Sequence, residues 1–233
     1  MKDLAAAYTR WRRTAVGHIT EQVERDLMFA LAGPLARRRV LDVGTGDGAY
    51  AIEAALRGAR VVGADVDAAA LDGARRRARD RGVSIDVMPA SFEALPLASG
   101  SFDVVLAVTV LCFVDDPRAA FREAARVLAP GGRLVVGDLA RWSTWAATRR
   151  VRGWLGNPTW RRARFWSRRE LAAHVESAGL RVVDVRGAAH FPKSSVLARA
   201  IQPIDAVLGR LHAPGAAFIA VAADKPELGR SAP

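Results

Sequence analysis

Short apolar runs alternate with longer amphipathic segments through the middle of the chain, and this alternation predicts the fold. Five apolar runs are bounded by turn residues and indicate buried strands. These strands are expected at residues 39–43, 60–65, 84–89, 102–108 and 132–138. The segments between them repeat apolar positions at helical spacing, at residues 48–58, 68–81 and 117–129. Alternating strands and helices are typical of a parallel sheet covered on both faces.

Further elements are expected on both sides of this alternating region. Two helices precede it, the second over residues 20–36 with a break at Gly33-Pro34. A helix at 167–177, a strand at 180–186, a helix at 194–211, a strand at 216–222 and a frayed tail from Asp224 follow it. We therefore expect one α/β domain, a Rossmann-like, seven-stranded, mostly parallel sheet flanked by helices. Its parts are an N-terminal helical lid (1–38), a ligand-binding core (39–140), a helical insert after the fifth strand (141–178) and C-terminal strands and helix (179–224).

A glycine-rich turn follows the first expected strand in the sequence VLDVGTGDG. Glycine at Gly44, Gly46 and Gly48 permits positive φ and lets a ligand lie against bare backbone. The next helix then points unpaired N–H groups at that ligand. Asp65, nineteen residues after Gly46, ends the second strand, where a carboxylate can accept hydrogen bonds from both hydroxyls of a ribose. The pattern predicts a nucleotide-type ligand with a free ribose.

Two other interpretations of the same turn stay open at this point. The letters also satisfy the dinucleotide fingerprint G-x-G-x-x-A at Gly44, Gly46 and Ala49, which is typical of oxidoreductases. A glycine turn that only connects a strand to a helix is the simpler alternative.

The composition says more about the cellular compartment of the protein than about its function. A single cysteine, Cys112, excludes a disulfide within the chain of 233 residues and fits a reducing compartment. No apolar signal core follows Lys2 and Asp3, and the longest apolar run, 104–114, is too short to span a bilayer. We expect a cytoplasmic protein. The net charge of +11 comes almost entirely from arginine, which a general compositional bias explains as well as a basic binding surface does.

Four ordered motifs together resemble the class I S-adenosylmethionine-dependent methyltransferases, in particular the small-molecule branch that includes ubiquinone and menaquinone biosynthesis enzymes. The motifs are VLDVGTGDG, VVGADVD, FEALPLASGSFDVVLAVTVLCFVDDP and REAARVLAPGGRLVVGD, and they cover roughly residues 38–140. The resemblance implies S-adenosylmethionine as cofactor, methyl transfer to a small-molecule acceptor that is apolar or aromatic, and no metal.

The resemblance also implies a set of cofactor-binding residues. Gly44, Thr45, Gly46 and Gly48 would flank the methionine part, with Asp42 beside them. Asp65 would hold the ribose, Val66 would pack on adenine, and Ala107 and Val108 would contact the cofactor from the end of the fourth strand. The sequence departs from the family pattern at Ala90-Ser91-Phe92, where glycine-aspartate-alanine is usual. Ser91 offers a weaker acceptor than the missing carboxylate, and Phe92 can still use its backbone. We expect binding to persist at somewhat lower affinity.

The sequence offers fewer candidates for residues that act on the methyl acceptor than for residues that bind the cofactor. A general base is needed only if the acceptor is an unionised oxygen or a protonated nitrogen. His190 follows the sixth strand, and Asp138 ends the fifth, at the edge where open α/β sheets bind ligands. We take these two as catalytic candidates, with a purely structural histidine as the alternative. Tyr8 and Trp11 share one face of the first helix and either close the cofactor site or pack inward.

The segment 141–169 has an unusual composition. It holds five of the six tryptophans and nine arginines, with no acidic residue. This make-up suits peripheral contact with a membrane surface, while an ordinary packed insert is the competing interpretation. Nucleic acid ranks lowest, because no recognised nucleic-acid module accompanies the segment. A dinucleotide-dependent oxidoreductase and a non-catalytic cofactor-binding protein remain the alternative functions.

Overall fold

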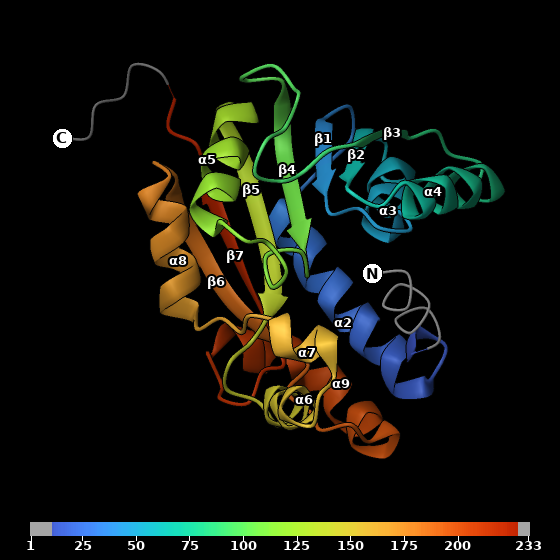
Figure 1. The fold of residues 1–233 in the computed structure, drawn as a ribbon, viewed down its shortest axis with the longest axis vertical. Coiled ribbons are helices and arrows are strands. Elements are labelled where there is room, and N and C mark those ends of the chain that lie inside the picture. Colours follow the sequence, from blue (N-terminus) through green and yellow to red (C-terminus); the bar gives the residue numbers. More distant parts are fainter. Residues whose placement is uncertain (1–10, 228–233) are drawn as a thin grey trace.

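The computed structural model describes residues 11–227, and the strands in that range form one seven-stranded sheet (Figure 1). Their order is β3-β2-β1-β4-β5-β7-β6, with β7 antiparallel to both of its neighbours and the other pairs parallel. The expected fold class is therefore confirmed. The strands are β1 (Arg39–Val43), β2 (Arg60–Asp65), β3 (Asp86–Pro89), β4 (Phe102–Val108), β5 (Leu128–Leu139), β6 (Arg181–Ala188) and β7 (Phe218–Asp224).

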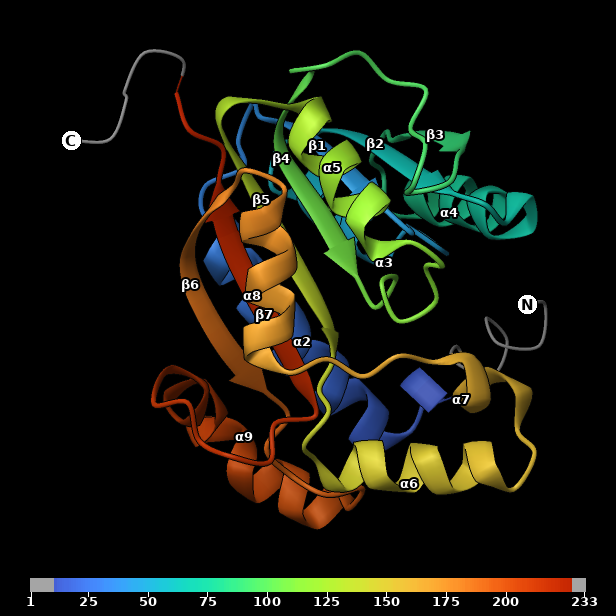
Figure 2. The ribbon, with the colours of Figure 1, turned by 60° about the vertical axis from the view of Figure 1, so that its left-hand side comes forward.

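Helices cover both faces of the sheet, as Figure 2 shows. On one face, α2 packs on β5 and β7 while α3 packs on β1 and β2; on the other, α5 and α8 pack on β5, β6 and β7. The helices are α2 (Ala15–Ala32), α3 (Ala49–Leu56), α4 (Ala68–Asp80), α5 (Pro117–Val127), α6 (Thr144–Trp154), α7 (Pro158–Arg162), α8 (Arg168–Ser177) and α9 (Ser195–Arg210). Each face has its own buried apolar cluster, so the sheet forms the middle of three layers.

The direction of α2 decides what lies at the ligand-binding edge of the sheet. Arg133, early in β5, donates a hydrogen bond from Nη1 to the Leu31 carbonyl. Gly137, near the end of β5, lies under Met28, whose sulfur would be 2.6 Å from a Cβ at that glycine. Helix α2 therefore runs antiparallel to β5. Its N-terminal half extends past the carboxyl end of that strand.

The boundaries of α2 differ from those expected. The helix begins at Ala15 rather than near residue 20, because the Thr14 side chain caps it by accepting a hydrogen bond from the Gly17 N–H. It ends at Ala32 rather than continuing to Ala36, at the break expected at Gly33-Pro34, because Gly33 takes a φ of 74° and leaves the helix. The helix expected around Tyr8 falls largely on residues 1–10, outside the described residues.

Several strand ends also differ from those expected, among them the start of β7 at Phe218 instead of residue 216 and the end of β6 at Ala188 instead of residue 186. β5 begins at Leu128 instead of residue 132, so the Pro-Gly-Gly turn belongs to the strand and α5 ends at Val127. β3 begins at Asp86 instead of residue 84. β7 continues to Asp224, which does not fray because its carboxylate binds the Arg133 guanidinium at 2.7 Å.

The insert after β5 contains two helices, α6 and α7, with α8 following it on the sheet. Ser143 caps α6 and Asn157 caps α7. Over residues 11–227, every helix is too short or too polar to cross a bilayer.

Candidate functional site

The turn after β1 leaves open space at its middle glycine. Gly44, Gly46 and Gly48 all have positive φ, as expected. A Cβ at Gly44 would lie 2.5 Å from the Val110 side chain, and one at Gly48 would lie 2.9 Å from the side chain of Ala74. A Cβ at Gly46 would meet nothing within 4 Å. The outer glycines are therefore required by packing, while the middle one presents bare backbone to an open region.

Asp65 lies beside this open region. Its Oδ2 accepts a hydrogen bond from the Gly46 N–H at 2.8 Å, and its Oδ1 accepts one from the Asp67 N–H at 2.9 Å. Each carboxylate oxygen has a second lone pair, so two hydroxyl donors can still bind. The neighbouring Val66 is 59% exposed, which leaves an apolar surface for a flat ring. The arrangement fits the ribose and adenine of S-adenosylmethionine.

Asp42 and Thr45 hold the turn from beneath. The Thr45 hydroxyl donates to Asp42 Oδ2 at 2.6 Å, and both residues are buried. Burial raises the pKa of Asp42 to about 7. The Thr45 side chain points toward the sheet, where a Cβ at Gly63 would be 2.9 Å from it. Direct contact of Asp42 and Thr45 with the cofactor stays a prediction.

The loop after β3 carries a carboxylate, that of Glu93, beside Ser91, and this carboxylate also accepts a hydrogen bond from the Asp116 N–H. Ser91 accepts a hydrogen bond from the Glu93 N–H at 3.3 Å, and its hydroxyl lies 3.4 Å from Glu93 Oε2. The Phe92 side chain is buried in the core, which leaves its backbone on the loop. An acidic group therefore stands next to Ser91 after all. Sequence analysis missed Glu93 because it lies two positions beyond the expected one.

The end of β4 carries a strained residue that sequence analysis also missed. Ala107 is fully buried and Val108 is half-buried. Thr109, the next residue, has a φ of 52° and donates its N–H to the Gly137 carbonyl at 2.8 Å. Positive φ is uncommon for threonine and is concentrated at functional sites. No residue type in the sequence signals this conformation.

Asp138 is fully buried and engaged with backbone. Its Oδ2 accepts a hydrogen bond from the Cys112 N–H at 3.0 Å, and its Oδ1 accepts one from the Leu139 N–H at 2.6 Å. Burial raises the pKa of Asp138 to about 6. The carboxylate thereby fastens the turn after β4 to the end of β5. A catalytic role for Asp138 remains a prediction.

His190 is buried beside α9. Its Nδ1 lies 2.9 Å from Asp205 Oδ1, and Asp205 also accepts the N–H groups of Ala189 and His190. The His190 Nε2 has no partner among the described residues. β6, which His190 follows, is four strands from β1, a lateral separation of roughly 19 Å. The structure thus pairs His190 with Asp205, away from the glycine-rich turn, and its catalytic role stays a prediction.

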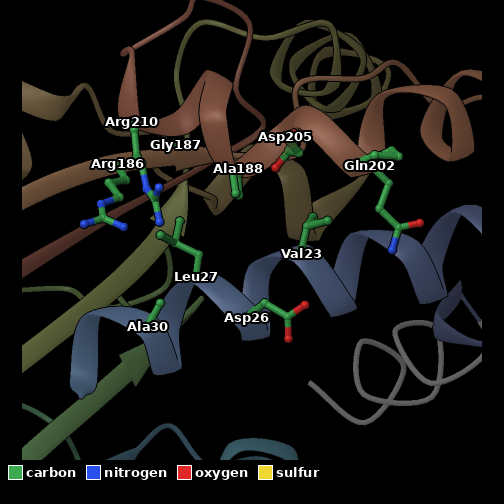
Figure 3. Close-up of a pocket in the computed structure, with 12 residues that line it drawn as sticks. Val23, Asp26, Leu27, Ala30, Arg186, Gly187, Ala188, Gln202, Asp205 and Arg210 are labelled. Atoms are coloured by element: carbon green, nitrogen blue, oxygen red, sulfur yellow. The ribbon is translucent and has the colours of Figure 1, made fainter.

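A cavity of about 490 Å³ lies between α2 and α9 at the end of β6 (Figure 3). Val23 and Leu27 line it from α2, and Asp205 and Gln202 line it from α9. It adjoins β6, which is four strands from β1 in the sheet order. We do not assign the cofactor to this cavity.

The residues before α2 are fastened to the glycine-rich turn. Arg12 forms ion pairs with Glu21, at 3.2 Å, and with Asp47, which directly follows Gly46. Trp11 meets Trp145 of α6 edge to face, with ring centroids 6.0 Å apart. Trp11 therefore packs against the insert. Tyr8 lies outside the described residues.

Titratable groups in the described part of the chain do not assemble a metal site. No group of three or more histidine, cysteine, aspartate or glutamate side chains is placed to hold a metal ion there. Cys112 is buried in a small apolar cluster, and burial raises the pKa of its thiol.

Comparison with known proteins agrees with this geometry. Residues 41–136 match a family model described as a methyltransferase domain. An uncharacterised protein of Mycobacterium tuberculosis is 38% identical, over 94% of this chain and 71% of its own. A ubiquinone biosynthesis O-methyltransferase of Methylobacterium is 33% identical, over 69% of this chain and 67% of its own. A crystal structure from Thermotoga maritima, described as a SAM-dependent methyltransferase and possible histamine N-methyltransferase, superposes with a TM-score of 0.71 at 25% identity, covering 94% of this chain and 95% of that one. The open turn with the Asp65 carboxylate beside it and the similarity to these enzymes lead to one conclusion: the chain belongs to the class I S-adenosylmethionine-dependent methyltransferases.

Proposed function

We propose that the protein transfers a methyl group from S-adenosylmethionine to a small apolar or aromatic acceptor by in-line displacement. The cofactor supplies a methyl group on a positively charged sulfur, which is already a reactive electrophile. The chain has then to hold the acceptor in line with that methyl group and to exclude water. In this proposal Gly46 and Asp65 hold the cofactor, and the elements beyond the carboxyl edge cover the acceptor.

One observation carries the proposal for an apolar acceptor. The elements that extend past the carboxyl edge bury a cluster of apolar and aromatic side chains between them. Trp145 of α6 is buried against Ile19 of α2 and against Phe191, which follows β6, with Trp11 on its edge. An acceptor bound beside such a cluster would be stabilised if it were apolar, because binding would remove its apolar surface from water.

The test is an acceptor screen with labelled S-adenosylmethionine, in which phenolic, quinol and aromatic amine compounds are compared with polar ones of similar size. We expect label transfer to aromatic acceptors, and loss of transfer in the Gly46→Val variant. Turnover confined to polar acceptors would refute the proposed acceptor class. Cofactor binding without transfer to any acceptor would favour the non-catalytic alternative, in which the chain senses or scaffolds.

We also propose that the outer face of α6 contacts an anionic lipid surface. The tryptophans of the insert differ in exposure, since Trp145 and Trp166 are buried and Trp160 is half-buried, while Trp142 and Trp154 are 72% and 83% exposed. Leu155 is exposed beside Trp154, and Figures 1 and 2 place α9, with exposed Val196, at the same end of the molecule. Arginines interleave these apolar residues, and residues 141–169 contain no acidic group. Apolar side chains among cations complement anionic headgroups.

A further inference from the structure

The cavity between α2 and α9, drawn in Figure 3, lies apart from the cofactor site. Its volume of about 490 Å³ is within the range of small-molecule sites. It adjoins β6, whereas the glycine-rich turn follows β1, four strands away in the sheet order. The chemistry of its lining therefore has to be considered separately from the binding of S-adenosylmethionine.

Small residues keep this cavity open. Its lining includes three alanines and one glycine, namely Ala30 of α2, Gly187 and Ala188 of β6, and Ala206 of α9. Ala30 and Ala206 are exposed while Ala188 is buried, so the cavity opens to solvent between the two helices and is closed at the sheet. A small molecule can therefore enter from solvent and reach β6.

The two ends of the cavity differ in their polar groups. Figure 3 shows Gln202 at one end of the lining and the two arginines, Arg186 and Arg210, at the other. Gln202 donates a hydrogen bond from Nε2 to Gln22 Oε1 at 3.2 Å, which joins α9 to α2 at that end. Arg210 follows Gln202 by eight residues on α9, a distance of about 12 Å along the helix. The cavity is thus long enough for an extended molecule with different groups at its two ends.

The arginine end has hydrogen-bond donors to spare. Arg186 donates from Nη2 to Asp184 Oδ2 at 2.5 Å and keeps further N–H groups, since a guanidinium group has five. Arg210 makes no hydrogen bond or ion pair with its side chain within residues 11–227. The Asp205 carboxylate also lines the cavity, but it already accepts two backbone N–H groups and lies 2.9 Å from the His190 ring nitrogen. This end is therefore suited to an anionic group.

The lining between the two ends is mostly apolar. Val23 and Leu27 of α2 are half-buried and line the cavity opposite Ala188, with Pro203 of α9 beside them. An apolar ligand body that covers these side chains would be stabilised by the removal of apolar surface from water. A carboxylate at the end of that body would match the planar guanidinium groups, which bind carboxylates through paired, charge-assisted hydrogen bonds.

We propose that this cavity binds a small amphipathic carboxylic acid, with its apolar body against α2 and its carboxylate on Arg186 and Arg210. The binding forms and breaks no covalent bond. It takes place at a second site, so it goes beyond methyl transfer and does not depend on it.

The experiment uses three probes with the same aliphatic chain, octanoate, 1-octanol and octylamine, titrated calorimetrically into the full chain saturated with S-adenosylhomocysteine. We expect octanoate to bind the wild type about tenfold or more tightly than 1-octanol, the effect of one charge-assisted hydrogen bond, and octylamine to bind least. Arg210→Gln should lose the preference for octanoate. Ala206→Trp should abolish octanoate binding, because the indole occupies the cavity.

Two matched controls come from the same helix. Arg199→Gln and Ala200→Trp change exposed residues of α9 outside the lining and should bind octanoate as the wild type does. All four variants should bind S-adenosylmethionine normally, which shows that they are folded. Octanoate that binds the wild type no more tightly than 1-octanol, or an unchanged preference in Arg210→Gln, overturns the inference. Displacement of S-adenosylhomocysteine by octanoate also overturns it, because the acid would then occupy the cofactor site.

Discussion

Replacing Asp65 by alanine tests the cofactor site most directly. The carboxylate accepts one backbone N–H on each oxygen, from Gly46 and from Asp67, and keeps one lone pair on each for a ribose hydroxyl. Hydrogen bonds to a charged group contribute about 1.5 to 3 kcal/mol each. If the variant loses the equivalent of one such bond, the Kd for S-adenosylmethionine rises about 10- to 150-fold.

The same substitution also removes the acceptor of the Gly46 N–H. A loss of affinity could therefore come from the lost ribose contact or from a disordered loop, and a second variant has to distinguish the two. Asp65→Asn keeps an acceptor oxygen for Gly46 while removing the charge. We therefore expect it to lower affinity less than Asp65→Ala does, with little change in thermal stability. Asp72→Ala, which removes an exposed carboxylate of α4 that pairs with Arg75, serves as the control and should bind normally.

Isothermal titration with S-adenosylmethionine and with S-adenosylhomocysteine measures these effects. Both ligands carry the same ribose, so their affinities should fall by the same factor. A Kd for Asp65→Ala within roughly twofold of the wild-type value would refute the assignment of Asp65 to the ribose.

Four further results are expected. Gly46→Val should abolish cofactor binding in titrations while circular dichroism stays native, since valine resists a φ of 54° and its side chain enters the open region; normal binding would place the cofactor elsewhere. Gly137→Ala should lower the free energy of unfolding by about 1 to 3 kcal/mol in urea titrations, because the new methyl would lie 2.2 Å from the Phe218 ring. The folded-state pKa of Glu24 lies above its unfolded value, so its contribution to stability is full below about pH 4.5 and is lost as the pH rises through about 8. Glu24→Gln should therefore gain more stability over the wild type at about pH 8 than at about pH 5, and an equal gain at both would contradict the raised pKa. The protein should float with anionic vesicles at low salt but not with neutral ones, and Trp154→Ala should weaken this flotation; no flotation under any condition would remove the membrane proposal.

Local patterns predicted the part of the site that is built from backbone. Gly44, Gly46 and Gly48 are close in sequence and share one conformational requirement, so their letters alone indicate the turn. Asp65 is identified by its fixed distance from that turn along a βαβ unit. These features need no knowledge of distant contacts.

The remaining residues depend on contacts that no local pattern encodes. Thr109 takes positive φ because its N–H bonds to Gly137, a residue on another strand. Asp138 was proposed as a catalytic residue from its place at the end of β5. Its hydrogen bond from the Cys112 N–H, however, depends on the turn after β4, which covers it. His190 was proposed from its place after β6, and the position of β6 in the sheet order, set by the antiparallel β7, carries it away from the glycine-rich turn.

Glu24 lies between these two cases, because the sequence did carry a signal for it. Thr20, Glu24, Met28 and Leu31 recur at helical spacing and form the buried face of α2. A carboxyl group on an otherwise inward-facing stripe breaks the rule that charged residues take the solvent side, and such a break points to a function. The pattern could not reveal which strand the stripe covers or whether a neighbouring arginine would pair with the acid. The structure supplies both answers, because Met28 of α2 covers Gly137 of β5 and the arginine that acts on the Glu24 carboxyl group is Arg149 of α6.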